Sequence, residues 1–345
     1  MHGGIYRSSL RFFLSKASWP AALCALALMP PGGLAFPGGL FDLARAVAGA
    51  QIIVGGVYLS DYHLPLASPS EPSRLARFRV ERVIKGAIAP GEVLIDVSPP
   101  DVGVGFAGQP EIALLNRTGG RLVPATLQAL RGIDSFLPAD GRGFTGTLDP
   151  LAEVVREVGN LLTDQRAPLA LRSIALGALR RVPGAKPYLA AEARDPTAQL
   201  RYPSIGFLIE GGDLSPLPGI AAELTGRGSI APEADILVYA IAEIKSPLAI
   251  PALDRIEREA PPQFRLAAIK ALGGTHSLAA IPGLRDALVR GNFEERYWAI
   301  SGMQMIMPRK EEPLISREYF REHEEELDRF WLDRTMSAAR PGHSG

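Results

Sequence analysis

Histidines are the first side chains to test for chemistry, because a histidine near carboxylates can bind a metal or transfer a proton. Outside the first 35 residues they are His63, His276, His323 and His343. His323 lies in a run of glutamates, but adjacent residues on a helix do not face a common point, and Glu326 alone has a usable spacing from it. This pattern favours a solvated helix face over a metal site.

The serine and cysteine side chains also give no sign of a catalytic nucleophile. Ser204, Ser277 and Ser301 lack the sequence context of an activated serine, although residues that meet only in space escape such a test. The chain contains no H-E-x-x-H, P-loop or G-x-S-x-G motif. Its one cysteine, Cys24, lies in an N-terminal leader, and removing that leader leaves no thiol. We therefore predict a protein that is not an enzyme, with no catalytic, cofactor-binding or metal-binding residue and no cofactor.

One glycine-rich run matches a nucleotide-binding pattern. The sequence from Gly103 to Gly108 has the form G-x-G-x-x-G. A dinucleotide loop needs a helix after it, so that the pyrophosphate meets the helix N-terminus. Here Gln109, Pro110 and a strand-like apolar run follow instead. We predict a glycine-rich surface loop.

Composition and charge favour a folded protein that does not bind nucleic acid. Hydrophobic residues make up 47% of the 345 residues and charged residues 21%, which is enough apolar sequence for a packed core. The formal net charge is zero. No dense block of lysine and arginine appears, so the basic footprint of a nucleic-acid binder is missing.

The first 35 residues are typical of a secretion signal. A basic stretch ends at Lys16, an apolar run extends from Trp19 to Met29, and small residues before and at Ala35 suit cleavage there. The apolar run is too short to cross a bilayer of roughly 30 Å. We predict a signal peptide, a periplasmic or secreted protein, and no stable membrane span after processing. The alternative is an uncleaved anchor or an organellar transit peptide.

Residues 36–137 show the two-residue alternation of β-strands. Val93, Ile95 and Val97 share one face, and the alternation of an earlier strand slips at Arg82, as a β-bulge would cause. We expect a helix at 41–50, a loop at 61–73 and strands near 51–58, 76–84, 93–97, 112–115 and 121–123. Five short strands with glycine turns predict a small barrel or sandwich. Residues 138–150 are the expected linker.

The C-terminal region repeats itself. Prolines recur at Pro187, Pro218, Pro251, Pro282 and Pro313, and a second series is Arg172, Arg201, Ala234, Arg265 and Arg296. A period near 31 residues indicates a helical solenoid. Small residues follow each member of the second series at helical spacing, and proline is tolerated in the first turn of a helix. We predict about five helix pairs over 151–312, a capping helix over 313–335 and a flexible tail over 336–345.

The segment from Ala249 to Met303 is similar to the HEAT-repeat family, especially its short bacterial form, which also occurs in bilin-lyase-like repeat proteins. The β-rich region resembles the netrin-like or OB-like domain of exported bacterial proteins. The resemblance implies an α+β multidomain chain: a small N-terminal β-barrel or sandwich, then an α-solenoid of HEAT-like helix pairs. Many relatives carry an Asp–Arg ladder. Ala234 breaks the arginine row here, and we expect no regular acidic partners.

Late aromatic residues are the candidate partner-binding site. Tyr297, Trp298, Tyr319 and Trp331 collect near the C-terminus, and exposed aromatic residues are typical interface hot spots. The alternative is that they fill the seam between the last repeat and the cap. We expect a scaffold or adaptor that binds a protein in the cell envelope through the solenoid surface or the interdomain groove. The alternatives are a chromophore-lyase-like enzyme, and glycan or small-ligand binding by the β-domain.

Overall fold

The computed structural model describes residues 42–64, 74–97, 105–125, 135–142, 149–226, 228, 230–308 and 315–338. The chain divides into two compact units, Met1–Phe41 and Asp42–Gly345. All described residues belong to the second unit, so the predicted signal peptide lies outside them. No helix in the described ranges has the length and apolarity needed to cross a membrane.

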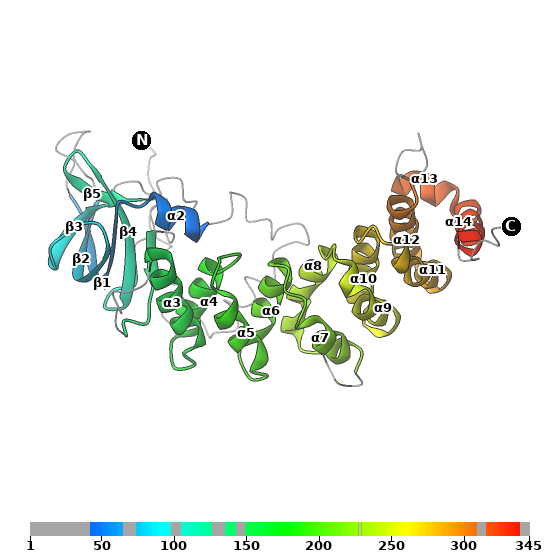
Figure 1. The fold of residues 1–345 in the computed structure, drawn as a ribbon, viewed down its shortest axis with the longest axis horizontal. Helices are drawn as coiled ribbons and strands as arrows, with labels where there is room; N and C mark the ends of the chain where they lie inside the picture. Colours follow the sequence, from blue (N-terminus) through cyan, green and yellow to red (C-terminus); the bar gives the residue numbers. More distant parts are fainter. Residues whose placement is uncertain are drawn as a thin grey trace, which may run out of the picture. The chain divides into compact units, whose positions relative to one another are not determined.

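The N-terminal part of the second unit is a small β-barrel (Figure 1). Its elements are α2 (Leu43–Gly49), β1 (Ile52–His63), β2 (Arg74–Lys85), β3 (Gly91–Asp96), β4 (Pro110–Thr118), β5 (Arg121–Pro124) and β6 (Phe136–Pro138). The strands follow the order β1-β2-β3-β5-β4, and β4 also pairs with β1, which closes the ring. The β3–β5 pair is parallel and the other pairs are antiparallel. The predicted barrel is confirmed.

Two details of the sheet differ from the sequence prediction. β6 was not expected, and it pairs with β4 where a linker had been predicted to begin. β1 also runs to His63, so the expectation that Asp61 begins a loop is wrong. Asp61 stays in the strand because its carboxylate accepts hydrogen bonds from Tyr58 at 2.8 Å and Arg74 at 2.6 Å. The predicted bulge is confirmed, since Ile53 faces Lys85 and Val54 faces Val83, which leaves Ile84 unopposed.

The helices after the barrel form a stack of pairs (Figure 1). They are α3 (Pro150–Thr163), α4 (Leu169–Ala178), α5 (Lys186–Arg194), α6 (Arg201–Glu210), α7 (Leu217–Leu224), η2 (Pro232–Ile236), α8 (Leu237–Ala242), η3 (Pro247–Ala249), α9 (Ile250–Glu259), α10 (Pro262–Gly274), η4 (Leu278–Ala280), α11 (Ile281–Arg290), α12 (Phe293–Ile306), α13 (Arg317–Glu322) and α14 (Glu324–Ala338). In the later units the first helices α8, α10 and α12 pack in one row, and the second helices α7, α9 and α11 pack in another. The predicted α-solenoid is confirmed.

The recurring prolines begin the second helix of each unit. Pro187, Pro218, Pro251 and Pro282 are each the second residue of α5, α7, α9 and α11. A first-turn N–H has no partner within the helix, so proline costs no hydrogen bond there. Pro313 lies outside the described residues.

Small residues allow α10 and α12 to approach closely. A Cβ added at Gly273 would lie 2.6 Å from the Cα of Gly302, and one added at Gly302 would lie 2.9 Å from the Cα of Gly273. The helix backbones therefore touch. The neighbouring repeat positions Ala268, Ala271 and Leu272 are fully buried in the same seam.

Gly273→Ala should lower the free energy of unfolding by about 1–3 kcal/mol, because the added methyl meets backbone that cannot yield. Gly219→Ala in α7 is the matched control, since a Cβ there would meet no atom within 4 Å. It should stabilise by about 0.5–1 kcal/mol, the usual gain for alanine in a helix. Urea unfolding of both variants checks this. A stabilising Gly273→Ala would show that the two helices do not pack as closely as described.

The cap consists of two helices where one had been predicted. The expected single helix breaks at His323, between α13 and α14. The break allows each helix to bury its own aromatic residue: Phe320 is fully buried, 5.2 Å from the Phe293 ring, and Trp331 is 1% exposed on α14. A straight helix would place both aromatic side chains on one face.

Candidate functional site

Arginine–glutamate pairs join the two helices of the first repeat units. Arg172 on α4 donates to Glu192 on α5 at 2.5 Å and to the Leu162 carbonyl at 2.8 Å. Both charged side chains are buried, at 2% and 1% exposure. In the next unit Arg201 donates to Glu223 at 2.8 Å. These pairs are structural, because each holds one helix of a unit against the other.

The arginines of the series do have acidic partners, but these do not recur at one repeat position, as expected of a ladder that is not continuous. Glu192 and Glu223 each stand five residues after a repeat proline, Pro187 and Pro218, whereas Ile256 and Ala287 stand at that place in the next two units. That spacing is the sequence signal for Glu192 and Glu223 alone. It does not reveal the pairing by itself, because the direction in which each side chain faces depends on how the second helix is rotated against the first.

Beyond Ala234 the ion pairs connect successive units. Glu257 on α9 is 4% exposed and accepts from Arg290 on α11 at 3.3 Å. Arg265 on α10 donates to Glu295 on α12 at 2.9 Å. Burial raises the pKa of Glu257 to about 7 against the opposing charge of Arg290. Pairs between successive units also occur earlier in the stack, as Arg180 and Glu210 show at 2.6 Å.

The described residues show no arrangement of a nucleophile with a base. The Ser301 hydroxyl donates to the Tyr297 carbonyl at 2.9 Å, and the Ser277 hydroxyl accepts from the Ala279 amide as a helix cap. Ser204 is fully buried, and its hydroxyl has no hydrogen-bond partner in the described structure. Across the described ranges, no three His, Cys, Asp or Glu side chains converge as a metal site requires.

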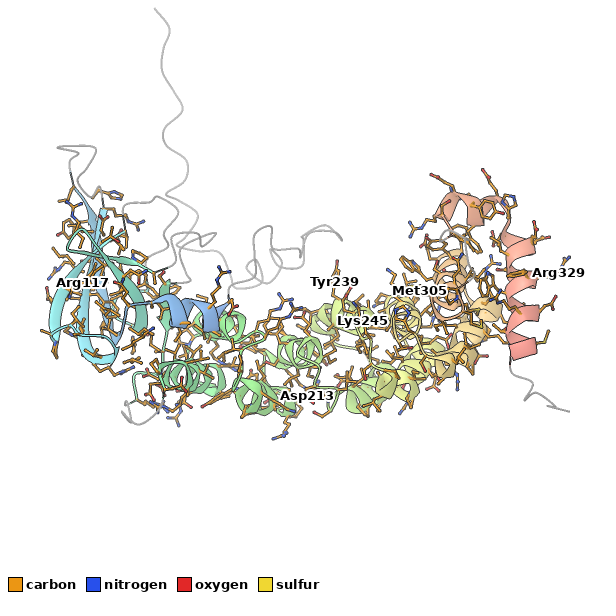
Figure 2. The ribbon with its side chains drawn as sticks, turned by 45° about the horizontal axis from the view of Figure 1, so that its top comes forward. Arg117, Asp213, Tyr239, Lys245, Met305 and Arg329 are labelled. Carbon is orange, nitrogen blue, oxygen red and sulfur yellow. The ribbon has the colours of Figure 1, made fainter. Side chains whose placement is uncertain are left out.

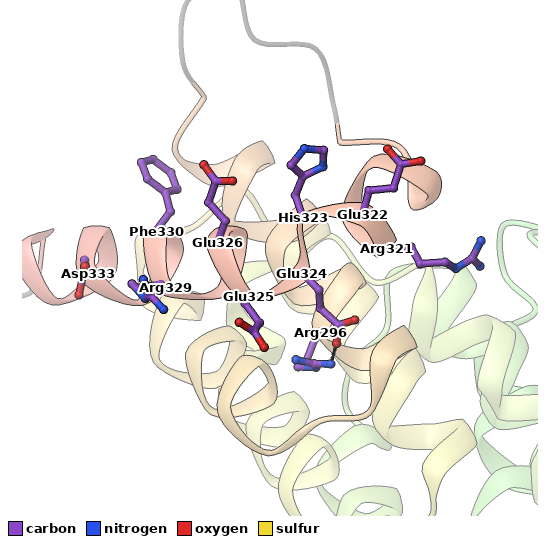
Figure 3. A pocket seen from close by; sticks show the side chains of 10 residues that line it. All are labelled: Arg296, Arg321, Glu322, His323, Glu324, Glu325, Glu326, Arg329, Phe330 and Asp333. Atoms are coloured by element: carbon purple, nitrogen blue, oxygen red, sulfur yellow. Dashed lines mark ion pairs between the residues drawn. The ribbon is translucent and has the colours of Figure 1, made fainter.

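An open recess lies beside α14 (Figure 3). It has a volume of about 850 Å³ and is lined mainly by charged side chains. Arg296 forms ion pairs there with Glu324 and with Asp328, the latter at 2.6 Å. His323 and Glu326 point to the other side of the helix, and the His323 ring stacks on Tyr319 at 4.1 Å. The recess is an open, ion-paired surface and not an enclosed site.

The four candidate aromatic residues fall into different environments. Trp331 is 1% exposed and belongs to the core between α14 and the last repeat. Tyr297 is half-buried and donates to the Ile315 carbonyl at 3.3 Å. Trp298 is half-buried beside it, with the ring centroids 5.3 Å apart, and Tyr319 is 49% exposed. Tyr319 is therefore the most exposed of the four, and Tyr297 and Trp298 pack against the edge of the core.

Two further residues extend this surface across three helices. Tyr239 and Lys270 each stand five residues after their unit's member of the arginine series, so they occupy the same position on α8 and α10. Tyr239 is 47% exposed and points away from α8 (Figure 2). The Lys270 ammonium lies 4.5 Å from the centroid of the Trp298 ring on α12. Met305 is half-buried on α12, seven residues and two helical turns after Trp298. We call Tyr239, Lys270, Trp298 and Met305 the first-helix surface.

The repeat register is the sequence signal for Tyr239 and Lys270. The aromatic candidates named from the sequence share only their clustering near the C-terminus, and an isolated tyrosine on α8 does not belong to that cluster. Only the packing of α8, α10 and α12 in one row places the helices that carry these residues side by side.

The charge of Lys270 is only partly stabilised. Burial lowers the pKa of Lys270, the nearby charge of Arg317 lowers it further, and Glu294 opposes both. Glu294 itself is paired with Arg317 at 2.6 Å. The three residues therefore leave one positive charge on this surface.

The barrel contains a buried carboxylate away from this surface. Glu111 on β4 is 1% exposed, and its Oε1 accepts from the Phe106 amide at 2.6 Å. Its Oε2 has no hydrogen-bond partner in the part of the chain that the structure describes. Burial raises the pKa of Glu111 to about 7. Gly105 is required beside it, because a Cβ there would overlap Oε2.

Glu111→Gln should stabilise the protein at neutral pH. Between about pH 4.5 and 7 the folded protein binds a proton at Glu111 that the unfolded chain has lost, so the free energy of unfolding falls as the pH rises. Glutamine cannot ionise at this position. At pH 8 the free energy of unfolding of the variant should therefore exceed that of the wild type by up to about 3 kcal/mol. The difference should vanish near pH 4. Urea midpoints from pH 4 to 8 test this, and equal midpoints at pH 8 would contradict it.

Comparisons with known proteins do not identify a family. No family model matches the sequence, and no curated protein matches it. Among solved structures, human deoxyhypusine hydroxylase in complex with glycerol aligns with a TM-score of 0.25 and 16% identity, over 55% of this chain and 76% of that one. A TM-score this low carries no argument about a shared fold or activity, so the architecture rests on the helices and strands described above.

Proposed function

We propose that this protein is a non-enzymatic scaffold that binds another protein through the first-helix surface. The observation that carries the proposal is the contact between Lys270 on α10 and Trp298 on α12 at 4.5 Å, together with the exposed Tyr239 on α8, the helix that packs against α10. Solenoids present extended surfaces built from equivalent positions of successive units. Tyrosine and tryptophan are enriched among the residues that dominate binding energy at interfaces.

The exposure of Tyr239 supports the proposal. Tyr239 stands five residues after Ala234, and Leu237, three residues after Ala234 on the same helix, is fully buried. Tyr239 leaves its ring 47% exposed instead. The exposed part of the ring is apolar surface that a bound partner would remove from water.

We also propose the finer assignments of both regions. The helix pairs, with a proline in each second helix, support membership of the HEAT-repeat family in its short bacterial form. The five-stranded closed barrel supports an OB-like or netrin-like module. We retain a periplasmic or secreted location as part of the proposal, because the leader has the composition of a signal peptide.

Site-specific photo-crosslinking in the native host tests the proposal. A photoreactive amino acid at position 239 should give a discrete crosslinked protein partner. Val289 on α11 is the matched control, because it is 63% exposed but lies in the row of second helices. No crosslink from position 239, or the same products from both positions, would refute binding at this surface.

A further inference from the structure

We propose that the first-helix surface recognises an extended segment of its partner in which a single aspartate or glutamate is flanked by apolar residues, with the carboxylate bound by Lys270. The inference rests on the proposed protein-binding function and specifies the chemistry of the partner. It follows from the charge, the surrounding rings and the spacing of the helices.

Lys270 is a cation that the repeat ladder does not neutralise. Arg172, Arg201, Arg265 and Arg296 each bind a carboxylate within their own or the next unit. Lys270 is half-buried, and no carboxylate among the described residues lies within ion-pair distance of its ammonium. Its ammonium lies 4.5 Å from the centroid of the Trp298 ring. A lysine held against a ring, with no ion-pair partner among the described residues, is available to an incoming anion.

The neighbouring charges favour an acidic ligand. Arg317 repels the Lys270 ammonium, and Glu294 is already engaged by Arg317 at 2.6 Å. A carboxylate from a partner would relieve this repulsion in a half-desolvated setting, where a charge pair is stronger than in bulk water. One uncompensated ammonium suits one carboxylate, since a phosphate group is more often held by several donors.

The helix spacing sets the pattern of the segment. Neighbouring helices lie about 8–10 Å apart, and an extended chain advances about 3.3 Å per residue. A chain crossing α8, α10 and α12 therefore moves by about three residues from one helix to the next. With its acidic residue at Lys270, an apolar side chain three residues away would reach Tyr239. Another on the opposite side would reach Met305, which shares a stripe of α12 with Trp298.

Selection from a random twelve-residue peptide display library on the full-length protein tests the inference. Enriched peptides should carry one aspartate or glutamate, with apolar residues about three positions away. The most enriched peptide and its Glu→Gln or Asp→Asn analogue are then titrated calorimetrically. The neutral analogue should bind the wild type at least tenfold more weakly.

Variants locate the contact. The Lys270→Gln variant should bind the acidic peptide at least tenfold more weakly than the wild type does, and it should bind the acidic peptide and its neutral analogue with equal affinity. The Lys270→Arg variant should retain most of the wild-type affinity. Lys245→Gln is the control, because it removes the same charge from an exposed position in the turn before η3 and should leave binding unchanged. If Lys270→Gln fails to fold, the comparison of the two peptides on the wild type still decides.

The outcomes separate the two proposals. Enriched peptides without an acidic residue, or acidic peptides that bind Lys270→Gln as well as the wild type, would overturn the carboxylate inference and leave protein binding intact. If the peptides bind the Tyr239→Ala and Trp298→Ala variants as tightly as the wild type, the binding site lies elsewhere. That result would overturn both the carboxylate inference and protein binding at the first-helix surface. Failure to enrich any peptide would likewise count against both.

Discussion

Arg172→Met should lower the free energy of unfolding by about 3–5 kcal/mol, the largest effect that we expect from a single substitution in the repeats. Methionine approximates the arginine stem but removes the guanidinium that binds Glu192 at 2.5 Å. Glu192 is 1% exposed, so its charge cannot be solvated by water. Gln165 remains as a donor at 3.0 Å, but a neutral amide cannot replace a charge.

The double variant Arg172→Met, Glu192→Met is the control for that result. Replacing a whole buried ion pair with apolar side chains of similar volume is often neutral or stabilising. The double variant should therefore recover most of the stability lost in the single variant, as judged by urea unfolding. If the single variant is as stable as the wild type, Glu192 has another source of stabilisation and the pair does not hold α4 against α5.

Trp331→Ala should cost about 3–5 kcal/mol, because the substitution leaves a large cavity beneath the cap. The indole is 1% exposed, and it contacts Phe330 edge-on at 5.4 Å. The Arg334 guanidinium lies 5.2 Å from its ring. Thermal unfolding followed by circular dichroism should show an early transition of the cap.

Tyr319→Ala is the counterpart of the Trp331 test. Tyr319 is 49% exposed, so its removal should change the unfolding free energy by no more than about 0.5 kcal/mol. Equal destabilisation by the two substitutions would show that both aromatic residues are core. A stable Trp331→Ala would instead return Trp331 to the candidate binding residues.

The candidate surface illustrates what a sequence can reveal about a solenoid. The aromatic cluster near Trp298 was visible as composition, but Trp331 and Trp298 looked equivalent there. They differ because Trp331 is 1% exposed and belongs to the core, whereas Trp298 is half-buried, packs against the edge of that core and contacts Lys270. Burial depends on which elements meet, and residues far apart in the chain decide that.

The sequence alone determined the division into a β-rich region and a helical stack, the placement of proline in the second helices, and the small residues between α10 and α12. These features follow from local rules: side-chain periodicity, proline's missing N–H and the space left by glycine. The tertiary structure decided the closure of the barrel, the break at His323 and the pairing of Glu257 with Arg290. It also placed the Lys270 ammonium against the Trp298 ring of the next first helix. Each of these depends on contacts between distant segments, and a repeat pattern does not specify how neighbouring helices are rotated against one another.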